Sequence, residues 1–524
     1  MDRSLFSSNS LLLLLLVMMM ASPLLLPFHP GDLLPLLPWQ VSRPLLGRLR
    51  NPADLVPAFV GRATASPNAS LEWKGPCFRR NLAWVEPHND SASVFGGGKL
   101  HIKTSMPCRW TCLDLYILAT PYRVTWTFFF FSRKHTIDFN EWQGEAEYDY
   151  VRKYGVSIFK MEAGMLGTLR ALSDVFSLFT DTRWGEKRNM EFLKKRMGAS
   201  FEPRRQPWAA EIDPTKLHSG DLFVLSKLRG RWGGFETLEK WVTGSYAGHS
   251  AVCLRDSEGK LWIGESGHEV SEGLDLIAVL PWEEWWEFEV KRDGSDPHIA
   301  LLPLHPEMRA KFNEAAAWEY ARSMEGKPYG YHNMIFSWID TVDSNFPLPA
   351  DPNLVASFMA VWNHLQPDYA PILWDEALNK RLGTQGLSFP EIMVEVERRR
   401  GGMSFAELLA VPERDEWVYS DGPSASCIAF VIGMYKAAGL FGPIASSIHV
   451  TEFTIKDAYS LKFFEDNSSR LPGWCEEAAA APPFCQVLGK YRMEFPGYNS
   501  VLPYAHMNER CPTLPPDYRR PLDC

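Results

Sequence analysis

The residue best suited to chemistry in this sequence is Cys427. It follows the turn-forming segment Asp421–Pro423 and Ser426, and it precedes apolar residues that recur at helical spacing through Tyr435. A thiol in the first turn of a helix lies at the positive end of the helix dipole, which favours the thiolate. The N–H groups of that turn have no partner inside the helix and can bind an oxyanion. The pattern predicts a nucleophile, and the alternative is a buried cysteine that opens an apolar helix.

A histidine suited to act as a base is His249. The segment Gly248–Leu254 alternates as a half-buried strand, and this alternation places His249 on the same face as Cys253. Its place beside a glycine, at the start of the strand, predicts an accessible position at the end of a sheet. The alternative for such a histidine is a structural role.

An acid that could orient this histidine is Glu265, in the strand-like segment Lys260–Ser266. A four-residue hairpin loop would pair Glu265 with Ser250 and place the acid on the face opposite His249. A three-residue loop that ends in a left-handed Gly259 pairs Glu265 with Ala251 and places the acid on the face of His249. The glycine at the end of the turn favours the second register, in which the carboxylate can orient an imidazole.

Five segments in a fixed order resemble one family. They are SGDLFVL, GHSAVCL, KLWIGES, GKPYGY and SCIAFV, beginning at Ser219, Gly248, Lys260, Gly326 and Ser426. This order resembles the circularly permuted branch of the NlpC/P60, papain-like superfamily, which includes YiiX-like and lecithin:retinol acyltransferase-like proteins. The resemblance covers about residues 212–340 and 415–442. The whole chain resembles a family of plant-type secretory proteins.

The resemblance implies a thiol site. Carried over by position, Cys427 is the nucleophile, His249 the base and Glu265 the orienting residue. It also places three further residues at the substrate cleft: Asp221, Tyr329 and Tyr331. The implied chemistry is hydrolysis or acyl transfer at an amide, ester or thioester, with peptide, N-acyl or lipid-ester substrates. The alternative is a catalytically inactive papain-like fold that binds a lipid, peptide or glycan. Cys253 and a helical insertion at about residues 341–415 depart from the family pattern.

The N-terminus predicts entry into the secretory pathway. An apolar run begins at Leu11 and continues to Phe28, so residues 1–28 are expected to form a cleaved signal peptide or an uncleaved membrane anchor. Three sequons fit this route, at Asn68, Asn89 and Asn467. The expected product is a glycoprotein of the endoplasmic reticulum, Golgi, vacuole or extracellular space, with or without the membrane anchor.

Nine cysteines divide into two terminal groups and a central pair. Three near the N-terminus and four near the C-terminus predict local disulfides. An odd count leaves at least one thiol unpaired within the chain. Cys253 and Cys427 remain as the central pair.

The charge balance excludes one class of partner. Lys and Arg number 54 against 63 Asp and Glu, so the net charge of −9 does not favour binding to nucleic acid. His249, Glu265 and His268 carry metal-ligating side chains, but their spacing matches no metalloprotease motif. No metal and no cofactor are expected. The Trp-rich segments 282–288 and 362–374 are expected either to pack a core or to line an apolar cleft.

The predicted fold class is α+β, with a permuted papain-like domain that carries a helical insertion and follows a small β-rich module. The expected order is a leader at 1–28, a Leu/Pro-rich linker at 29–69, the β-rich module at 70–145, a helical connector at 146–204, the papain-like domain at 205–445 and a Cys/Pro-rich tail at 446–524.

Overall fold

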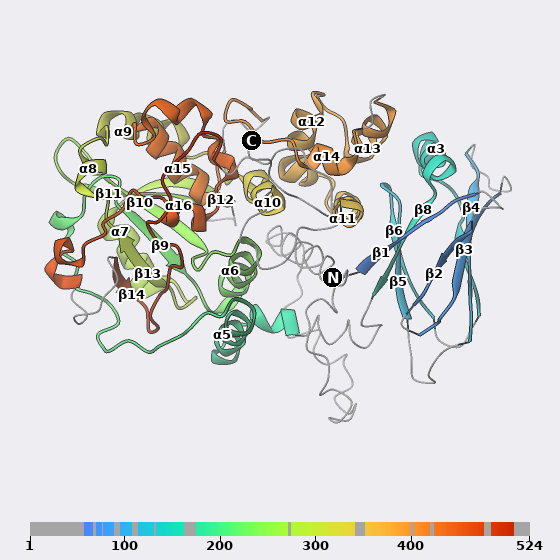
Figure 1. Cartoon of the computed structure of the whole chain (residues 1–524), viewed down its shortest axis with the longest axis horizontal. Coiled ribbons are helices and arrows are strands. Elements are labelled where there is room, and N and C mark those ends of the chain that lie inside the picture. The colour runs from blue at the N-terminus through green and yellow to red at the C-terminus, as the bar shows by residue number, and fades with distance from the viewer. Residues whose placement is uncertain are drawn as a thin grey trace. The chain divides into compact units, whose positions relative to one another are not determined.

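The structure is a computed structural model that describes residues 57–65, 70–75, 77–88, 95–106, 114–129, 133–161, 174–270, 274–340, 352–399, 403–419, 424–475 and 484–507. They form two compact units (Figure 1). Unit 1 combines the residues up to 176 with those between 347 and 409. Unit 2 combines the residues between 177 and 346 with those from 410 to 513. The prediction of mixed helices and antiparallel strands is confirmed.

Unit 1 is built on two four-stranded antiparallel sheets. The first has the order β1 (Pro57–Ala63), β8 (Val156–Met161), β5 (Asp114–Ala119) and β6 (Val124–Phe129). The second has the order β2 (Leu71–Trp73), β3 (Asn81–His88), β4 (Gly97–Thr104) and β7 (Lys134–Phe139). One apolar cluster draws on both sheets, including Trp73, Leu100, Tyr116 and Ile158, so the core lies between them.

The helices of unit 1 come from two parts of the chain. They are α3 (Gly144–Tyr154), α11 (Pro352–Leu365), α12 (Glu376–Leu382), α13 (Phe389–Arg398) and α14 (Phe405–Leu409), with a π-helical turn at Pro371–Asp375. The last four helices belong to the predicted helical insertion, and residues 347–409 are part of this unit. Trp362 and Trp374 are fully buried, so these two tryptophans pack a core.

Two expectations fail in unit 1. β8 is a strand inside residues 146–204, which were expected to form a helical connector. The helix stops because Gly155 takes a positive φ of 82°, and the following residues pair with β1 and β5 instead. β1 likewise forms a strand inside the segment expected to be a linker.

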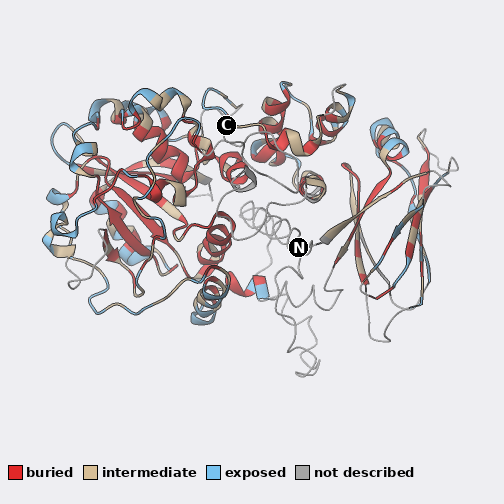
Figure 2. Cartoon of the chain, viewed as in Figure 1, coloured by how far each residue is buried: buried red, intermediate tan, exposed pale blue. Residues whose placement is uncertain are grey.

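Unit 2 is organised around one six-stranded antiparallel sheet. Its order is β12 (Leu274–Pro281), β11 (Leu261–Val270), β10 (His249–Arg255), β9 (Leu222–Ser226), β13 (His298–Leu302) and β14 (Cys485–Leu488). Every residue of β9 and β13 is buried, as Figure 2 shows for the centre of this sheet. The segment expected to be an irregular tail therefore supplies β14, an edge strand of the central sheet.

The helices of unit 2 are α5 (Arg183–Met197), α6 (Gly230–Thr243), α7 (Trp282–Glu287), α8 (Pro306–Arg309), α9 (Glu314–Met324), α10 (Tyr331–Asp340), α15 (Cys427–Ala437) and α16 (Ile455–Ser460). α15 packs on β10 and β11, and its apolar residues join one cluster with Val252 and Leu254. The opposite face of the sheet packs against Trp282 and Trp285 of α7, which are core residues. The period-two alternation of β10 separates these two faces.

One buried hydrogen bond ties α15 to the start of the sheet. The Tyr435 hydroxyl donates to the Gly220 carbonyl oxygen at 2.7 Å. We expect Tyr435→Phe to lower the free energy of unfolding by about 1–3 kcal/mol, because it leaves a buried carbonyl without its partner. Urea unfolding of the full chain measures the change.

Tyr320→Phe is the matched control for this substitution. The Tyr320 ring is partly buried against the same core, and its hydroxyl has no hydrogen bond among the described residues. It should change the stability by only a few tenths of a kcal/mol. Equal effects of the two substitutions would show that the Tyr435 bond does not anchor α15.

Candidate active site

The hairpin between β10 and β11 has the register that the sequence favoured. Ala251 pairs with Glu265 and Arg255 with Leu261, and Gly259 ends the turn with a positive φ of 80°. His249 is the first residue of β10, opposite Leu225 of β9. His249 and Glu265 therefore lie on the same face of the sheet.

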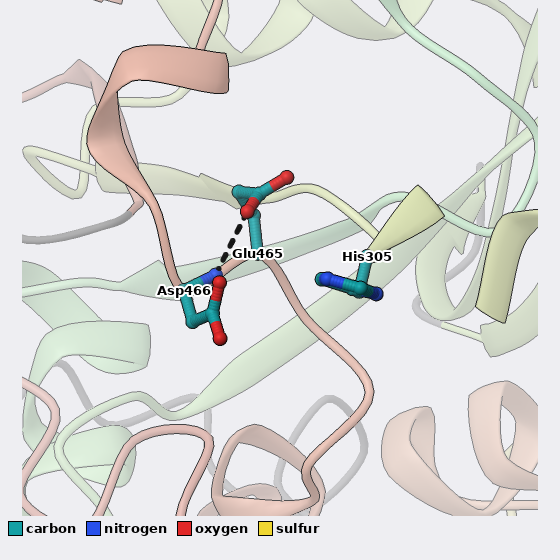
Figure 3. Close-up of side chains that lie close together, drawn as sticks. All are labelled: His305, Glu465 and Asp466. Atoms are coloured by element: carbon teal, nitrogen blue, oxygen red, sulfur yellow. Dashed lines mark hydrogen bonds between the residues drawn. The ribbon is translucent and has the colours of Figure 1, made fainter. Parts of the chain in front are cut away.

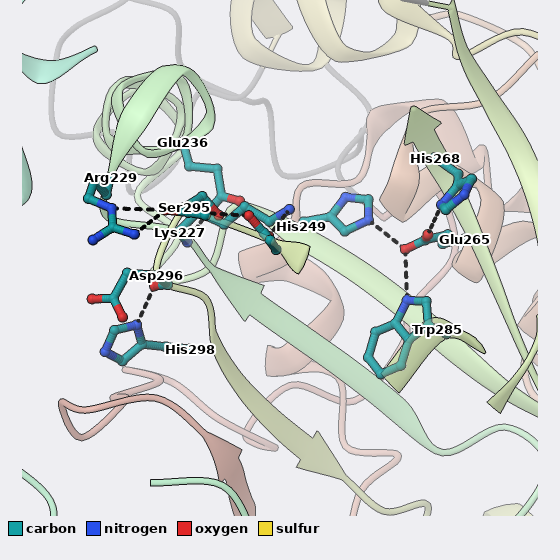
Figure 4. A network of polar contacts seen from close by, with 12 residues as sticks. Lys227, Arg229, Glu236, His249, Glu265, His268, Trp285, Ser295, Asp296 and His298 are labelled. Carbon is teal, nitrogen blue, oxygen red and sulfur yellow. Dashed lines mark hydrogen bonds and ion pairs between the residues drawn. The ribbon is translucent and has the colours of Figure 1, made fainter. Parts of the chain in front are cut away.

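Glu265 is a buried carboxylate that binds three ring N–H groups (Figure 4). Its Oε2 atom lies 3.1 Å from His249 Nε2 and accepts the Trp285 indole N–H at 3.2 Å. Its Oε1 atom lies 2.9 Å from His268 Nδ1. Burial raises the pKa of this carboxyl, but its hydrogen bonds with His249 and His268, and their charges, hold the pKa well below its usual range. Glu265 therefore carries a full negative charge beside His249.

Cys427 is held at the start of α15 by a helix cap, by one neighbouring strand and by one turn. The Ser426 side chain accepts the Ala429 N–H at 3.3 Å and caps the helix, as the sequence predicted. Two residues before the thiol, the Ala425 carbonyl accepts the Ser266 hydroxyl at 2.6 Å and the Gly330 N–H at 3.0 Å. β11 and the Gly326–Tyr331 turn thus fix the position of the nucleophile candidate.

The Cys427 thiol and the His249 imidazole form a polar pair. Because Nε2 of the ring faces Glu265, Nδ1 is the nitrogen that remains for the thiol. Burial lowers the pKa of His249, but hydrogen bonds with Cys427 and Glu265, and their charges, raise it well above its usual value. Burial raises the pKa of Cys427, and the hydrogen bond and charge of His249 outweigh it, so the thiol pKa is lowered. This arrangement favours a thiolate beside an imidazolium.

Cys253 provides an internal contrast. Both central cysteines are free and buried. Burial and the charge of Asp221 raise the pKa of Cys253 well above its usual value, so this thiol stays protonated. Only one of the two central thiols is therefore activated.

Tyr329 lies beside the Cys–His pair. A β-bulge at Gly267 of β11, with a positive φ of 105°, brings the backbone close to two rings. A Cβ at this glycine would lie 3.3 Å from Tyr329 Cδ2 and 3.5 Å from His249 Cε1. The Tyr331 ring packs edge-on against Tyr329, and its hydroxyl donates to Asp275 at 2.5 Å. Tyr329 is thus at the site, and Tyr331 supports it.

The structure does not bring Asp221 to this site. Its carboxylate accepts the backbone N–H groups of His218 at 2.8 Å and Leu304 at 2.9 Å, and it pairs with Arg309. It precedes β9 at the end that pairs with Val252, so it lies at the opposite end of β10 from His249. The carboxylate anchors loops away from Cys427 and His249, and its role in substrate binding stays a prediction.

Glu239 of α6 is a site residue that sequence reasoning missed. Its side chain is buried at 7% exposure and has no hydrogen bond or ion pair among the described residues. Burial, followed by the charges of Cys427 and Glu236, raises its pKa well above the usual value, while the charges of Lys240 and His249 oppose this. The Glu239 carboxyl is therefore neutral, and it lies within range of the charge on Cys427. Helical spacing in α6 gave no signal, because nearly every residue of this helix is buried.

A second charged cluster lies against Gly248, the residue before His249. The Glu236 carboxylate pairs with Lys240 at 3.2 Å and accepts the Lys227 N–H at 2.7 Å. Lys240 also donates to the Ser226 hydroxyl at 2.6 Å. Figure 4 shows Lys227 and Glu236 close to the start of β10. Removing one partner of such a buried pair leaves an uncompensated charge.

A possible cation cluster lies elsewhere in unit 2. His305, Glu465 and Asp466 offer ligand atoms within 4.8 Å of one another (Figure 3). Arg470 Nη1 lies 3.2 Å from both His305 Nε2 and Glu465 Oε1. The Glu465 carboxylate also accepts the backbone N–H of Asp466 at 3.1 Å. A guanidinium already balances the acid, so the cluster is a loop-holding network.

Other expectations fall partly outside the described residues. Cys475 and Cys485 form a disulfide, and Cys77 is also disulfide-bonded. Asn467 is exposed and caps a short 3₁₀ turn, whereas Asn68, Asn89 and the leader lie outside the described residues. Among the described helices, none has the length and apolar character that a membrane span requires.

Comparison of the chain with protein-family models, with curated proteins and with solved structures found no match. The residues of the site offer an activated thiol, a base oriented by a buried carboxylate, and a neutral acid nearby.

The alkylation rate of Cys427 should reveal this activation. We expect limiting iodoacetamide to modify Cys427 well below pH 8, because its thiolate is already present there, while Cys253 stays unmodified. In His249→Ala the reaction should shift to higher pH, because the imidazolium that lowers the thiol pKa is gone. Peptide mass spectrometry of the folded, non-reduced protein measures both sites at once. Equal labelling of the two cysteines would contradict the assignment.

Glu265→Gln should lower the pH at which the His249 imidazolium beside Cys427 loses its proton. The carboxylate raises the pKa of His249, so its neutralisation should let the imidazolium lose its proton at a lower pH. NMR titration of the His249 ring measures this shift. Glu258→Gln is the control, because this exposed acid lies in the hairpin turn away from the imidazole. An unchanged His249 titration in Glu265→Gln would refute the orienting role.

Gly248→Ala should displace His249, because the added methyl group would clash with the neighbouring Glu236 side chain. A Cβ at Gly248 would lie 2.4 Å from Glu236 Cγ and Oε2, and the carboxylate is held by its two bonds. We expect a loss of about 1–3 kcal/mol in the free energy of unfolding and slower alkylation of Cys427. Gly294→Ala, which meets nothing within 4 Å, is the control for both measurements.

Proposed function

We propose that this chain is a cysteine-dependent hydrolase or acyltransferase that acts on an amide, ester or thioester bond. The observation that carries the proposal is that two buried thiols have pKa values shifted in opposite directions, and that only Cys427 has a histidine partner. The pKa of Cys427 is lowered by His249, although burial raises it, whereas the pKa of Cys253 is raised. A structural cysteine needs no such partner. Perturbed thiols with an oriented base are typical of nucleophiles.

The order of the elements also supports a permuted papain-like fold for unit 2. The β9 strand, the histidine strand β10, the carboxylate strand β11, the Gly326–Tyr331 turn and the cysteine helix α15 follow one another along the chain. This is the order in which the resemblance places the same features. We propose the NlpC/P60-like, YiiX-like and lecithin:retinol acyltransferase-like branch as the family.

The geometry supports a two-step reaction. The Cys427 thiolate attacks the substrate carbonyl carbon, and a C–S bond forms as the carbonyl electron pair moves to oxygen. The tetrahedral intermediate then expels the leaving group, which takes the proton from Nδ1 of His249. Neutral imidazole next removes a proton from water or from an acyl acceptor. That nucleophile attacks the thioester, and the thiolate leaves as the product is released.

Donors for the oxyanion lie at the start of α15. In the first helical turn the Ser426 side chain accepts the Ala429 N–H and Tyr329 accepts the Cys427 N–H, which leaves the N–H of Ile428 for an oxyanion. Burial, followed by the charge of Cys427, raises the pKa of Tyr329 well above its usual value, while a hydrogen bond from the Cys427 N–H opposes this. The Tyr329 hydroxyl is therefore neutral and can donate to an oxyanion. Glu265 stabilises the imidazolium that accompanies the first step.

Trapping of an acyl-enzyme tests the proposal directly. The full chain is incubated with p-nitrophenyl acyl esters, acyl thioesters and N-acyl amides, and intact mass spectrometry detects an acyl group on Cys427. We expect Cys427→Ala to abolish the adduct and His249→Ala to slow its formation by about 10²–10⁴-fold. Cys253→Ser, the matched control, should react at the wild-type rate.

A non-catalytic binding protein predicts another result. If no substrate class acylates Cys427 while the control protein is folded, the fold serves binding and the catalytic proposal fails. Acylation that is equal in wild type and His249→Ala would reject the proposed base while leaving a reactive thiol.

A further inference from the structure

A second site lies in unit 1, independent of the thiol chemistry. A cavity of about 300 Å³ is lined by residues of β1, β8 and α3 on one side and of α11, α13 and α14 on the other. This volume is at the lower end of the range for small-molecule pockets, roughly 300–1,000 Å³. The β-sandwich and the helical insertion therefore enclose a space large enough for a small ligand.

Two buried residues with hydroxyl groups line this cavity, and neither hydroxyl has a hydrogen-bond partner among the described residues. Tyr150 is 4% exposed and Ser157 is 6% exposed. Buried hydroxyls are almost always hydrogen-bonded in folded proteins. Both residues line the cavity, so a molecule inside the cavity can supply the missing hydrogen-bond partner.

Three side chains with planar polar groups also line this cavity: Arg62, Asn353 and Glu397. Arg62 donates from Nη2 to Asn353 Oδ1 at 3.4 Å, but its buried Nε has no partner among the described residues. Glu397 lines the cavity from α13. Burial raises the pKa of Tyr150, the positive charge of Arg62 lowers it, and the negative charge of Glu397 raises it again. Both charges thus lie near the Tyr150 hydroxyl.

The lining favours a neutral ligand rich in hydroxyl groups. The guanidinium of Arg62 and the carboxylate of Glu397 offset each other, so neither a free anion nor a free cation is preferred. Guanidinium, carboxylate and carboxamide groups can each bond two adjacent hydroxyls. Met393 and Phe405 add apolar surface to the same cavity, which suits the C–H face of a sugar ring.

We propose that this cavity binds a single sugar residue, either as a free saccharide or as the end of a glycan. Arg62, Asn353 and Glu397 bond its hydroxyls, and Tyr150 and Ser157 gain the partners that the protein does not supply. The site thereby adds carbohydrate recognition to a chain whose other unit carries the thiol.

The test uses the full chain and a panel of glucose, galactose, mannose, xylose and N-acetylglucosamine, with a glycan array for terminal residues. Saturation-transfer NMR and calorimetry detect binding. Tyr150→Phe should weaken the tightest ligand about tenfold, because it removes one buried hydrogen bond. Arg62→Gln should weaken it at least as much. Tyr148→Phe, on the same helix but outside the cavity lining, should not.

Other outcomes separate this site from its alternatives. Cys427→Ala should leave sugar binding unchanged, so failure of the thiol proposal does not decide this one. Binding of free amino acids in preference to sugars would overturn the saccharide assignment, since Arg62 and Glu397 could also hold a zwitterion. A folded protein that binds no member of the panel or array has a cavity that holds water only, and the proposal is then wrong. Equal affinity in wild type and Tyr150→Phe would also overturn it.

Discussion

The buried negative charge of Glu265 is the interaction on which the site depends. A carboxylate at 5% side-chain exposure is unfavourable unless donors replace its lost water. His249, His268 and Trp285 supply those donors from three different elements. Because one donor is the imidazole, the same bond that solvates the carboxylate orients the base and favours its charged form. The charged imidazole in turn lowers the pKa of the thiol.

The rest of unit 2 brings these groups together from distant parts of the chain. The Gly259 turn sets the register that places Glu265 beside His249, and the bulge at Gly267 opens room for Tyr329. Ser266 and Gly330 bind the loop that leads to Cys427. The helix that carries the thiol packs on the strands that carry the base and the carboxylate. The register of β10 and β11 and the packing of α15 on them therefore together position His249, Glu265 and Cys427.

Local patterns in the sequence predicted much of this arrangement. Alternation and the turn glycine fixed the β10–β11 register, and the Ser426 cap located the start of α15. The helical connector expected at 146–204 is interrupted by β8, because Gly155 ends the preceding helix with a positive φ. Glu239 could not be identified from the sequence, since the raised pKa of its carboxyl depends on burial and on neighbours that only tertiary packing supplies. Asp221 matched a motif, but the motif gave no information on which end of the strand it would occupy.

The central claim is that Cys427 exists as a thiolate because His249 is charged beside it. The most direct measurement is the ultraviolet thiolate absorbance of the folded protein across pH, taken as the difference between wild type and Cys427→Ser. An ordinary thiol titrates at a pKa of about 8.5. The account predicts that the thiolate signal persists well below this pH in wild type and is lost there in His249→Ala. A signal that appears only above the ordinary range, or that is unchanged without His249, would contradict it.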